Sequence, residues 1–184
     1  MNTLDTKWSK VYDEGKDFRV LFPSDLGRIF ELLQPDTTKR HLDIGCGTGG
    51  LTRDLFHRGY LSTGIDPSSS AIKRAKDATV YLDRGIDYIC KDFEKIDLSE
   101  HSYSLITCKL VYAFFSDKKK SINKMAKLLA PNGSLVLITP LHTSEEMATP
   151  ISVTREDVYG ALSSSFNKIQ ELNFEWVTCY VCQN

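Results

Sequence analysis

Apolar residues along the chain recur with two different spacings. Leu26, Ile29, Phe30 and Leu33 lie three or four residues apart, which predicts an amphipathic helix over residues 25–34. Short apolar runs that end at glycine or polar residues predict buried strands instead. Together the two spacings predict helices over residues 25–34, 48–58, 68–76, 117–130 and 154–163, and strands over residues 41–44, 60–65, 86–90, 104–108, 134–139, 168–175 and 177–182.

The order of these elements predicts the fold class. Strands that alternate with helices favour right-handed crossovers and a parallel sheet. The last two strands, 168–175 and 177–182, are too close for a helix between them, so they should pair as an antiparallel hairpin. A turn is expected at Pro131-Asn132-Gly133, before the fifth strand. The prediction is an α/β, doubly wound, mostly parallel seven-stranded sheet with an antiparallel C-terminal hairpin, a Rossmann-like fold.

Composition and charge narrow the class of protein. The 184 residues are 41% hydrophobic and 26% charged, as in an ordinary globular protein, and are expected to form one domain over 1–184. The net charge of −1 gives no support to nucleic-acid binding. No apolar run suits a membrane helix or a secretory signal, so a cytoplasmic location is expected. The five cysteines are interpreted as small buried thiols rather than disulfides or zinc ligands, and no metal is expected.

A glycine-rich segment follows the first predicted strand and opens a helix. Glycines at such a turn allow positive φ and a close approach of the backbone to a ligand. In doubly wound folds, ligands bind beyond the carboxyl ends of the strands, where this turn lies. Gly45, Gly47 and Gly50 also match G-x-G-x-x-G, so a nicotinamide-dependent oxidoreductase is one alternative, and a turn without a ligand is another.

Three acidic positions favour a different ligand. Asp43 lies two residues before Gly45, where its carboxylate would repel a pyrophosphate but attract the ammonium of an amino acid. Asp66 ends the next predicted strand and can accept hydrogen bonds from ribose hydroxyls. Asp92 and Phe93 follow the third strand, and offer a carboxylate for an exocyclic amine and a ring to pack on a base.

The segment Asp43-Ile44-Gly45-Cys46-Gly47-Thr48-Gly49 resembles the first motif of class I S-adenosylmethionine-dependent methyltransferases. The resemblance continues in the same order over residues 41–139. Residues 103–108 resemble the family's fourth strand, and residues 128–134 its approach to the fifth. The resemblance implies a methyltransferase with S-adenosylmethionine as its cofactor.

The resemblance also implies roles for individual residues. The glycines of the first motif should line the methionine part of the cofactor, with Asp43 near its ammonium. Asp66 should hold both ribose hydroxyls, and Asp92 should accept from the adenine amino group. The implied cofactor-binding residues are Asp43, Gly45, Cys46, Gly47, Gly49, Asp66, Pro67, Asp92, Phe93, Cys108 and Lys109.

The acceptor of the methyl group is less well defined. Ser104, Ala113 and Phe114 depart from the acidic and histidine residues that many family members carry there. Little of the chain remains for a separate recognition domain, so a small-molecule acceptor is favoured and nucleic acid is not. A protein or RNA acceptor, and a cofactor-binding regulatory module without catalysis, stay open as alternatives.

Four further residues are candidates for the acceptor side. Trp8 and Tyr12 are similar in position to aromatic residues of small-molecule methyltransferases, in which this segment folds over the cofactor, although both could simply be packing residues. Residues 1–35 are therefore expected to form an N-terminal helical lid, assisted by the loop over residues 140–150. His142 and Tyr112 are candidates for a catalytic base, with a loop histidine and a core tyrosine as the alternatives.

Overall fold

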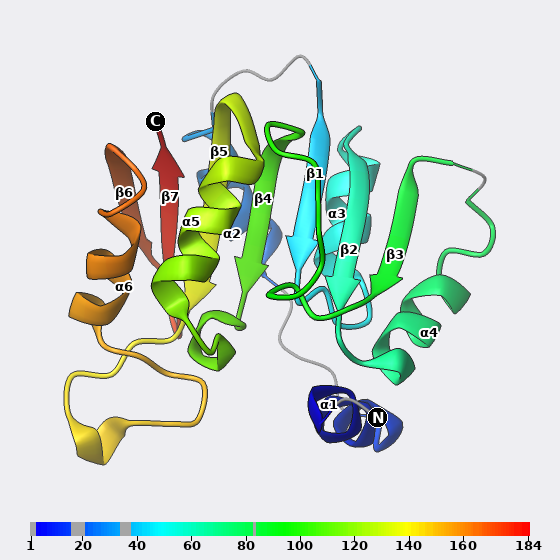
Figure 1. The fold of residues 1–184 in the computed structure, drawn as a ribbon, viewed down its shortest axis with the longest axis horizontal. Coiled ribbons are helices and arrows are strands. Elements are labelled where there is room, and N and C mark those ends of the chain that lie inside the picture. Colours follow the sequence, from blue (N-terminus) through cyan, green and yellow to red (C-terminus); the bar gives the residue numbers. More distant parts are fainter. Residues whose placement is uncertain (1–2, 16–20, 34–37, 83) are drawn as a thin grey trace.

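Strands and helices alternate along the chain in a computed structural model that describes residues 3–15, 21–33, 38–82 and 84–184 (Figure 1). The helices are α1 (Thr3–Asp13), α2 (Pro23–Phe30), α3 (Gly50–His57), α4 (Ser69–Asp77), α5 (Lys118–Leu128) and α6 (Arg155–Leu162), with the 3-10 turns η1 (Tyr112–Phe114) and η2 (Glu145–Met147). The strands are β1 (Arg40–Ile44), β2 (Leu61–Asp66), β3 (Ile86–Cys90), β4 (Tyr103–Lys109), β5 (Leu129–Thr139), β6 (Lys168–Asn173) and β7 (Thr178–Gln183).

Within the described residues the strands form one seven-stranded sheet in the order β3-β2-β1-β4-β5-β7-β6. Strands β1 to β5 pair in parallel, whereas β7 is antiparallel to both β5 and β6. The predicted fold class, including the C-terminal hairpin, is confirmed. The strand order reverses between β1 and β4, and open α/β sheets bind ligands at the carboxyl ends of strands that meet in this way.

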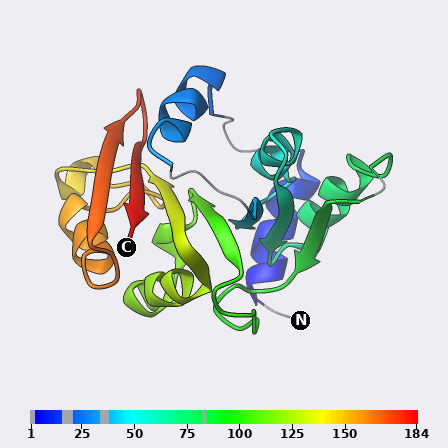
Figure 2. The ribbon, with the colours of Figure 1, turned by 90° about the horizontal axis from the view of Figure 1, so that it is seen from above.

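Helices cover both faces of the sheet, as Figure 2 shows from above. On one face, α5 and α6 pack on a core that includes Leu42, Ile44 and Leu137. On the other face, α2 and α3 pack on Leu105 and Val136, and α4 covers the end of the sheet at β3. The alternation of side chains along each buried strand therefore supplies two separate apolar layers.

The predicted turn before the fifth strand is wrong. The chain passes from α5 directly into β5 at Leu129, so the Pro131-Asn132-Gly133 segment lies inside the strand. The pairing of β4 with β5 shifts between Tyr103 and Leu105, because several β5 residues oppose a single step of β4. Asn132 has a φ of 63°, and a Cβ on Gly133 would lie 3.0 Å from the carbonyl oxygen of Tyr103. The turn residues thus form an irregularity within the strand.

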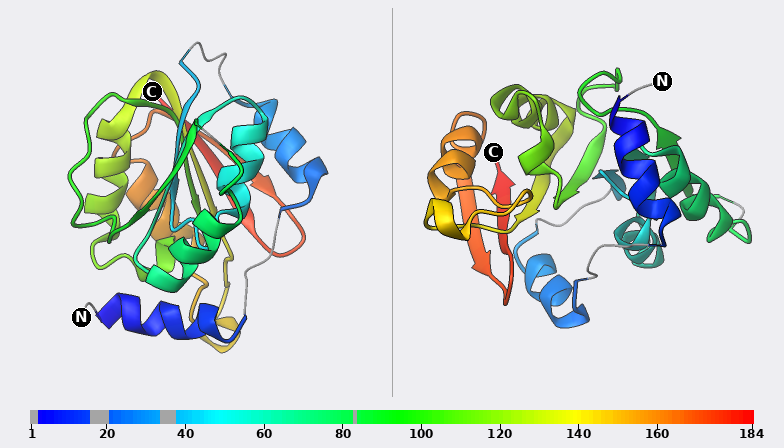
Figure 3. Two further views of the ribbon diagram at one scale, coloured as in Figure 1. Left: turned by 90° about the vertical axis from the view of Figure 1, so that its right-hand side faces the viewer. Right: turned by 90° about the horizontal axis from the view of Figure 1, so that it is seen from below.

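The N-terminal segment also differs from its prediction in detail. Trp8 and Tyr12, expected before the first helix, lie within α1. This helix lies across the carboxyl ends of the parallel strands, and the left-hand view of Figure 3 shows it below the sheet. The rest of the predicted lid is partly outside the described residues, because 1–2, 16–20 and 34–37 are not described.

The cysteines do not share one environment. Cys108, Cys179 and Cys182 are buried in strands, as expected of small core residues, and all five cysteines are free thiols. Cys46 is only partly buried and Cys90 is exposed, so the prediction of buried thiols is wrong for these two. Among the described residues, no helix is both long enough and apolar enough to cross a membrane.

Gly64 of β2 is expected to tolerate no side chain. A Cβ there would lie 2.8 Å from both Cys46 Sγ and the Tyr88 ring, so Gly64→Ala should lower the free energy of unfolding by about 1–3 kcal/mol. Gly160 in α6 is the matched control, because a Cβ there meets nothing within 4 Å. Gly160→Ala should raise the free energy of unfolding by about 0.5–1 kcal/mol. Denaturant unfolding measures both, and a Gly64→Ala protein as stable as the wild type would contradict this packing.

Candidate functional site

The glycine-rich turn after β1 lies against the end of β2. The amides of Gly45 and Cys46 both donate to the carbonyl oxygen of Ile65, at 2.7 and 3.1 Å. Gly45, Gly47 and Gly49 have φ values of 67°, 54° and 77°, a region that residues with a Cβ rarely adopt. The turn therefore needs glycine for its backbone path.

Neighbouring elements approach all three of these glycines closely. A Cβ on Gly45 would lie 2.1 Å from Val111 Cγ2, and one on Gly47 would lie 2.6 Å from the hydroxyl of Tyr12. A Cβ on Gly49 would lie 2.5 Å from the hydroxyl of Tyr88. The three glycines thus serve different contacts.

Asp66 joins the loops that follow β1 and β2. Its Oδ2 accepts from the amide of Gly47 at 2.9 Å, and its Oδ1 accepts from the amide of Ser68 at 2.8 Å. Burial raises the pKa of Asp66 to about 6, and the two amides and the nearby Asp43 modify that effect. Each carboxylate oxygen has a further acceptor position, so Asp66 can still bind a ligand hydroxyl.

Asp43 lies deeper, with 2% of its surface exposed. Its two oxygens accept from the hydroxyls of Thr52 and Thr107, each at 2.7 Å. Burial raises the pKa of Asp43, while these hydroxyls and the charge of Lys109 act in the opposite direction. A cationic ligand group beside Asp43 would compensate this buried carboxylate.

The loop after β3 is fixed to α5. Asp92 Oδ1 accepts from the amide of Glu94 at 3.0 Å, and its Oδ2 lies 3.2 Å from Lys95 Nζ. Lys124 Nζ donates to the carbonyl oxygen of Phe93 at 2.6 Å and lies 4.7 Å from the centre of its ring. The Glu94 carboxylate accepts from the amide of Ser116, next to the start of α5.

Helix α1 is held on two sides. On one side, Asp5 accepts from the amide of Ser69 at 3.0 Å, and Ser9 lies 3.0 Å from the hydroxyl of Ser68, both at the start of α4. On the other side, the ring of Trp8 meets that of Phe114 edge-on, with 4.8 Å between centroids. The helix therefore bridges from α4 to η1 across the ends of the central strands.

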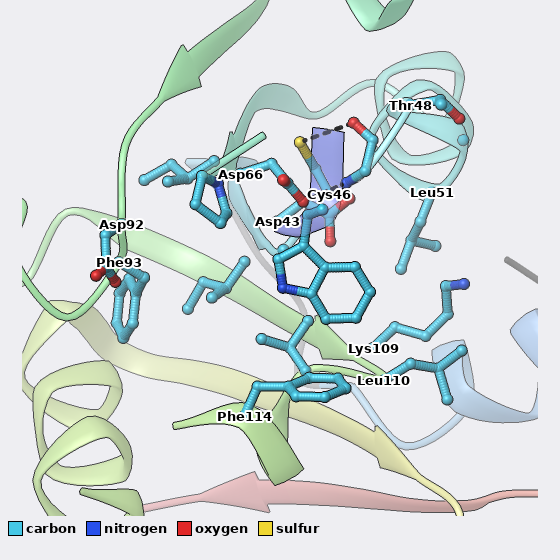
Figure 4. Close-up of a pocket in the computed structure, with 18 of the residues that line it drawn as sticks. Asp43, Cys46, Thr48, Leu51, Asp66, Asp92, Phe93, Lys109, Leu110 and Phe114 are labelled. Atoms are coloured by element: carbon cyan, nitrogen blue, oxygen red, sulfur yellow. Dashed lines mark hydrogen bonds between the residues drawn. The ribbon is translucent and has the colours of Figure 1, made fainter. Parts of the chain in front are cut away.

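A cavity of about 200 Å³ lies between these elements (Figure 4). Asp43, Asp66 and Asp92 all line it, and the close-up shows Asp92 and Phe93 on one side and Phe114, Leu110 and Lys109 on another. The predicted cofactor and lid residues that line the cavity are Asp43, Gly45, Cys46, Gly47, Asp66, Pro67, Asp92, Phe93, Lys109, Trp8 and Tyr12.

Four predicted site residues do not line the cavity. Gly49 faces Tyr88, and Cys108 is fully buried in the core beneath α5. Tyr112 is also fully buried, and its hydroxyl donates to the carbonyl oxygen of Asp157 at 3.1 Å. His142 Nδ1 instead lies 2.9 Å from the hydroxyl of Ser152, beyond the cavity. The structure thus gives neither proposed base a place in the cavity, and its described residues 140–150 do not line it either.

Sequence reasoning missed much of the apolar wall. Leu110 has a φ of 62°, unusual for a branched residue, so the chain turns sharply after β4 and presents the next residues to the cavity. The available signal in the sequence was an apolar run directly after this strand, where a polar loop is expected. The position of Phe114 is already associated with the acceptor side by the sequence. The other cavity-lining apolar residues absent from the prediction are Leu21, Ile44, Leu51, Ile65, Leu110, Val111, Phe115 and Ile151.

The chain is similar in sequence to known methyltransferases. Ubiquinone biosynthesis O-methyltransferases are similar to the chain: that of Coxiella burnetii is 34% identical over 101 residues, 55% of this chain and 43% of the relative. The enzyme of Idiomarina loihiensis is 30% identical over 139 residues, which are 75% of this chain and 57% of the relative. The chain thus spans about half the length of these curated relatives.

A solved structure shares the fold over nearly its whole length. The TehB-like SAM-dependent methyltransferase from Corynebacterium glutamicum superposes with a TM-score of 0.68 at 16% identity, covering 97% of this chain and 95% of that one. Residues 42–137, just over half of the chain, match the sequence model of the family described as "Methyltransferase domain". From β1 to β5, the part that builds the glycine turn and the carboxylates of the cavity, the chain belongs to this family, the class I S-adenosylmethionine-dependent methyltransferases.

Proposed function

We propose that the chain is an S-adenosylmethionine-dependent methyltransferase that acts on a small, largely apolar acceptor. The observation that carries the proposal is the cavity, in which three carboxylates and a glycine turn face an apolar wall. Asp43 would bind the ammonium of the cofactor, Asp66 its ribose hydroxyls and Asp92 its adenine amino group. With a pKa of about 6, Asp66 is mostly ionised at pH 7 and can accept from both hydroxyls.

The residues beside the end of β4 support an apolar acceptor. Trp8, Leu110 and Phe114 line the cavity near Asp43 and the glycine turn, where the methyl group would lie. A small molecule fits a cavity that α1 covers, and the relatives carry the name of enzymes of ubiquinone biosynthesis. A protein or RNA acceptor finds no matching support in a net charge of −1 or in an enclosed site.

S-adenosylmethionine supplies a methyl group that is already activated on a sulfonium. The chain's own residues therefore mainly bind, orient and exclude water, which are contributions of proximity and desolvation. None of the described residues that line the cavity is a histidine, and the buried hydroxyl of Tyr112 is used by Asp157. We expect the acceptor to react without Tyr112 or His142 as its base.

We also propose that α1 acts as the lid of this site. Trp8 and Tyr12 both line the cavity, and the Trp8–Phe114 contact closes it from the side of η1. The hydrogen bonds of Asp5 and Ser9 at the start of α4 would act as the hinge side. The alternative, a binding module without catalysis, predicts cofactor binding but no methylated product.

The first test is ligand choice. S-adenosylmethionine and S-adenosylhomocysteine should bind, whereas NAD should not, because Asp43 would repel a pyrophosphate at the glycine turn. Calorimetry measures all three, and ligand at one hundred times its dissociation constant should add about 2.7 kcal/mol to the free energy of unfolding.

Labelled cofactor with a metabolite extract should then give a labelled small molecule. Binding of NAD alone would overturn the proposal, and label in protein or RNA only would overturn the acceptor class.

The two discarded bases give a second test. Tyr112→Phe should lower the free energy of unfolding by about 1 kcal/mol, since one buried hydrogen bond to Asp157 is lost. Transfer of label to the extract should be unchanged in Tyr112→Phe and in His142→Ala. A folded variant of either kind with transfer reduced a hundredfold would restore that residue as a catalytic base.

The lid gives a third test. Trp8→Ala removes the ring contact with Phe114 and should reduce label transfer at least tenfold, while the affinity for S-adenosylhomocysteine changes less. Lys10→Ala on the exposed side of the same helix is the matched control and should change neither. Hydrogen exchange over residues 3–15 should slow when cofactor is added. Equal transfer by Trp8→Ala and wild type would remove α1 from the mechanism.

A further inference from the structure

A row of polar side chains lies buried under α3, beside the cavity. His41 and Asp43 are two residues apart on β1 and so point to the same face of the sheet. His41 is paired in register with Ser62 of β2, and Asp43 with Thr107 of β4. The exposed fractions of these four residues are between 0 and 4%. Groups buried this deeply need hydrogen-bond partners inside the protein.

The four side chains form a continuous chain of hydrogen bonds. Ser62 Oγ lies 3.1 Å from His41 Nδ1, and His41 Nε2 lies 2.8 Å from Thr107 Oγ1. Thr107 Oγ1 in turn donates to Asp43 Oδ1 at 2.7 Å. Asp43 is the only member of the four that lines the cavity among the described residues. The chain therefore leads from the interior of the sheet to the cofactor site.

The imidazole in this chain is neutral. Burial lowers the pKa of His41 to about 3, and the ring packs edge-on against Tyr60 with 6.1 Å between centroids. A neutral imidazole has one N–H donor and one acceptor nitrogen. It must therefore donate to one neighbour and accept from the other.

The single hydroxyl proton of Thr107 decides which nitrogen donates. When that proton is given to an ionised Asp43, Thr107 can only accept from His41. His41 must then carry its proton on Nε2 and accept the hydroxyl proton of Ser62 at Nδ1. All three donors point toward Asp43, and donors aligned in this way favour the carboxylate form.

We propose that His41 is a positioning residue whose Nε2–H tautomer holds Asp43 in its ionised form for the cofactor. The value of this for binding rests on the proposed function, whereas the link between tautomer and carboxylate does not.

Protonation of Asp43 would reverse the chain. The new proton would lie on Asp43 Oδ1 and be donated to Thr107, while Oδ2 would still accept from Thr52. Thr107 would then donate to His41 Nε2, and His41 would carry its proton on Nδ1, directed to Ser62. One proton is taken up in total, and the ring stays neutral in both states. The tautomer of His41 thus reports the charge of Asp43.

Other titratable groups also act on Asp43. Lys109 at the end of β4 favours its charge, whereas Asp66 and Cys46 oppose it. Cys108 and Tyr88 also interact electrostatically with Asp43, and burial raises the pKa of each of them. None of these groups takes part in the hydrogen bonds of His41 described above. A change in the tautomer of His41 therefore distinguishes the effect of the hydrogen-bonded chain from the electrostatic effects of these groups on Asp43.

Nitrogen NMR of the wild-type protein tests the chain without any ligand. The histidine side chains are labelled, and the His41 signals are identified as those that are missing from the His41→Gln variant. These signals are then followed while the pH is lowered. At the upper end of the pH range we expect the His41 ring to carry its proton on Nε2. As the pH falls, the proton should move to Nδ1 in step with the titration of the Asp43 carboxyl signal. In Asp43→Asn the tautomer should no longer change with pH. A ring that becomes doubly protonated, or keeps one tautomer while Asp43 titrates, would overturn the proposal.

Binding of S-adenosylhomocysteine as a function of pH tests the value of the chain. His41→Leu should move the midpoint of the affinity profile upward by about one pH unit, which below the wild-type midpoint means about tenfold weaker binding. His41→Gln can donate and accept in the same places and should keep the wild-type midpoint. If His41→Leu does not fold, Thr107→Val with Thr107→Ser as its control replaces it.

The outcomes of the two experiments are distinct. Equal midpoints in all folded variants would overturn the positioning role. If the wild type binds no S-adenosylhomocysteine, the proposed function fails, while the NMR titration still decides whether the tautomer follows Asp43.

Discussion

The position of the site depends on the carboxylate of Asp66. It accepts from Gly47 of the turn after β1 and from Ser68 at the start of α4, and so fixes two loops that parallel pairing of β1 and β2 alone would leave separate. The carbonyl oxygen of Ile65 adds a bond from the amide of Gly45. These contacts bring backbone amides and a carboxylate to one place at the switch point of the sheet. Because the Asp66 carboxylate that makes these contacts is buried, its pKa is raised to about 6.

Most of the fold could be predicted because hydrophobic spacing depends on which side of an element faces the core. The central strands β4 and β5 carry runs of buried apolar residues, and the helices each have an apolar side, so both patterns survive in the sequence. The start of β5 could not be predicted in this way. Pro131 and Gly133 are typical of a turn, and the same residues also suit an irregularity inside a strand. Only the neighbouring β4 decides between the two.

The site could be predicted where backbone position alone determines it. Asp43, Asp66 and Asp92 lie at or just after strand ends, so parallel pairing brings them to one edge regardless of their rotamers. For Tyr112 and Phe114, backbone position alone does not decide which side chain faces the cavity, because both lie on the same 3-10 turn. Residues two apart on such a turn point in different directions, and here Tyr112 faces the core while Phe114 faces the cavity. Residue type suggested the tyrosine for chemistry, whereas the packing of α6 against it decides otherwise.

Electrostatics relate the fold to the choice of ligand. Asp43 and Asp66 are buried beside one another, and the charge of each disfavours the charge of the other. Hydroxyl and amide donors compensate this only in part, because they bring no positive charge. A ligand with an ammonium near Asp43 and hydroxyls near Asp66 would add a positive charge and further donors to those already supplied by the protein. A dinucleotide would add a pyrophosphate at the same glycine turn and increase the repulsion. We therefore expect the Asp43 carboxylate beside the glycine turn to favour a ligand that carries an ammonium group over a dinucleotide.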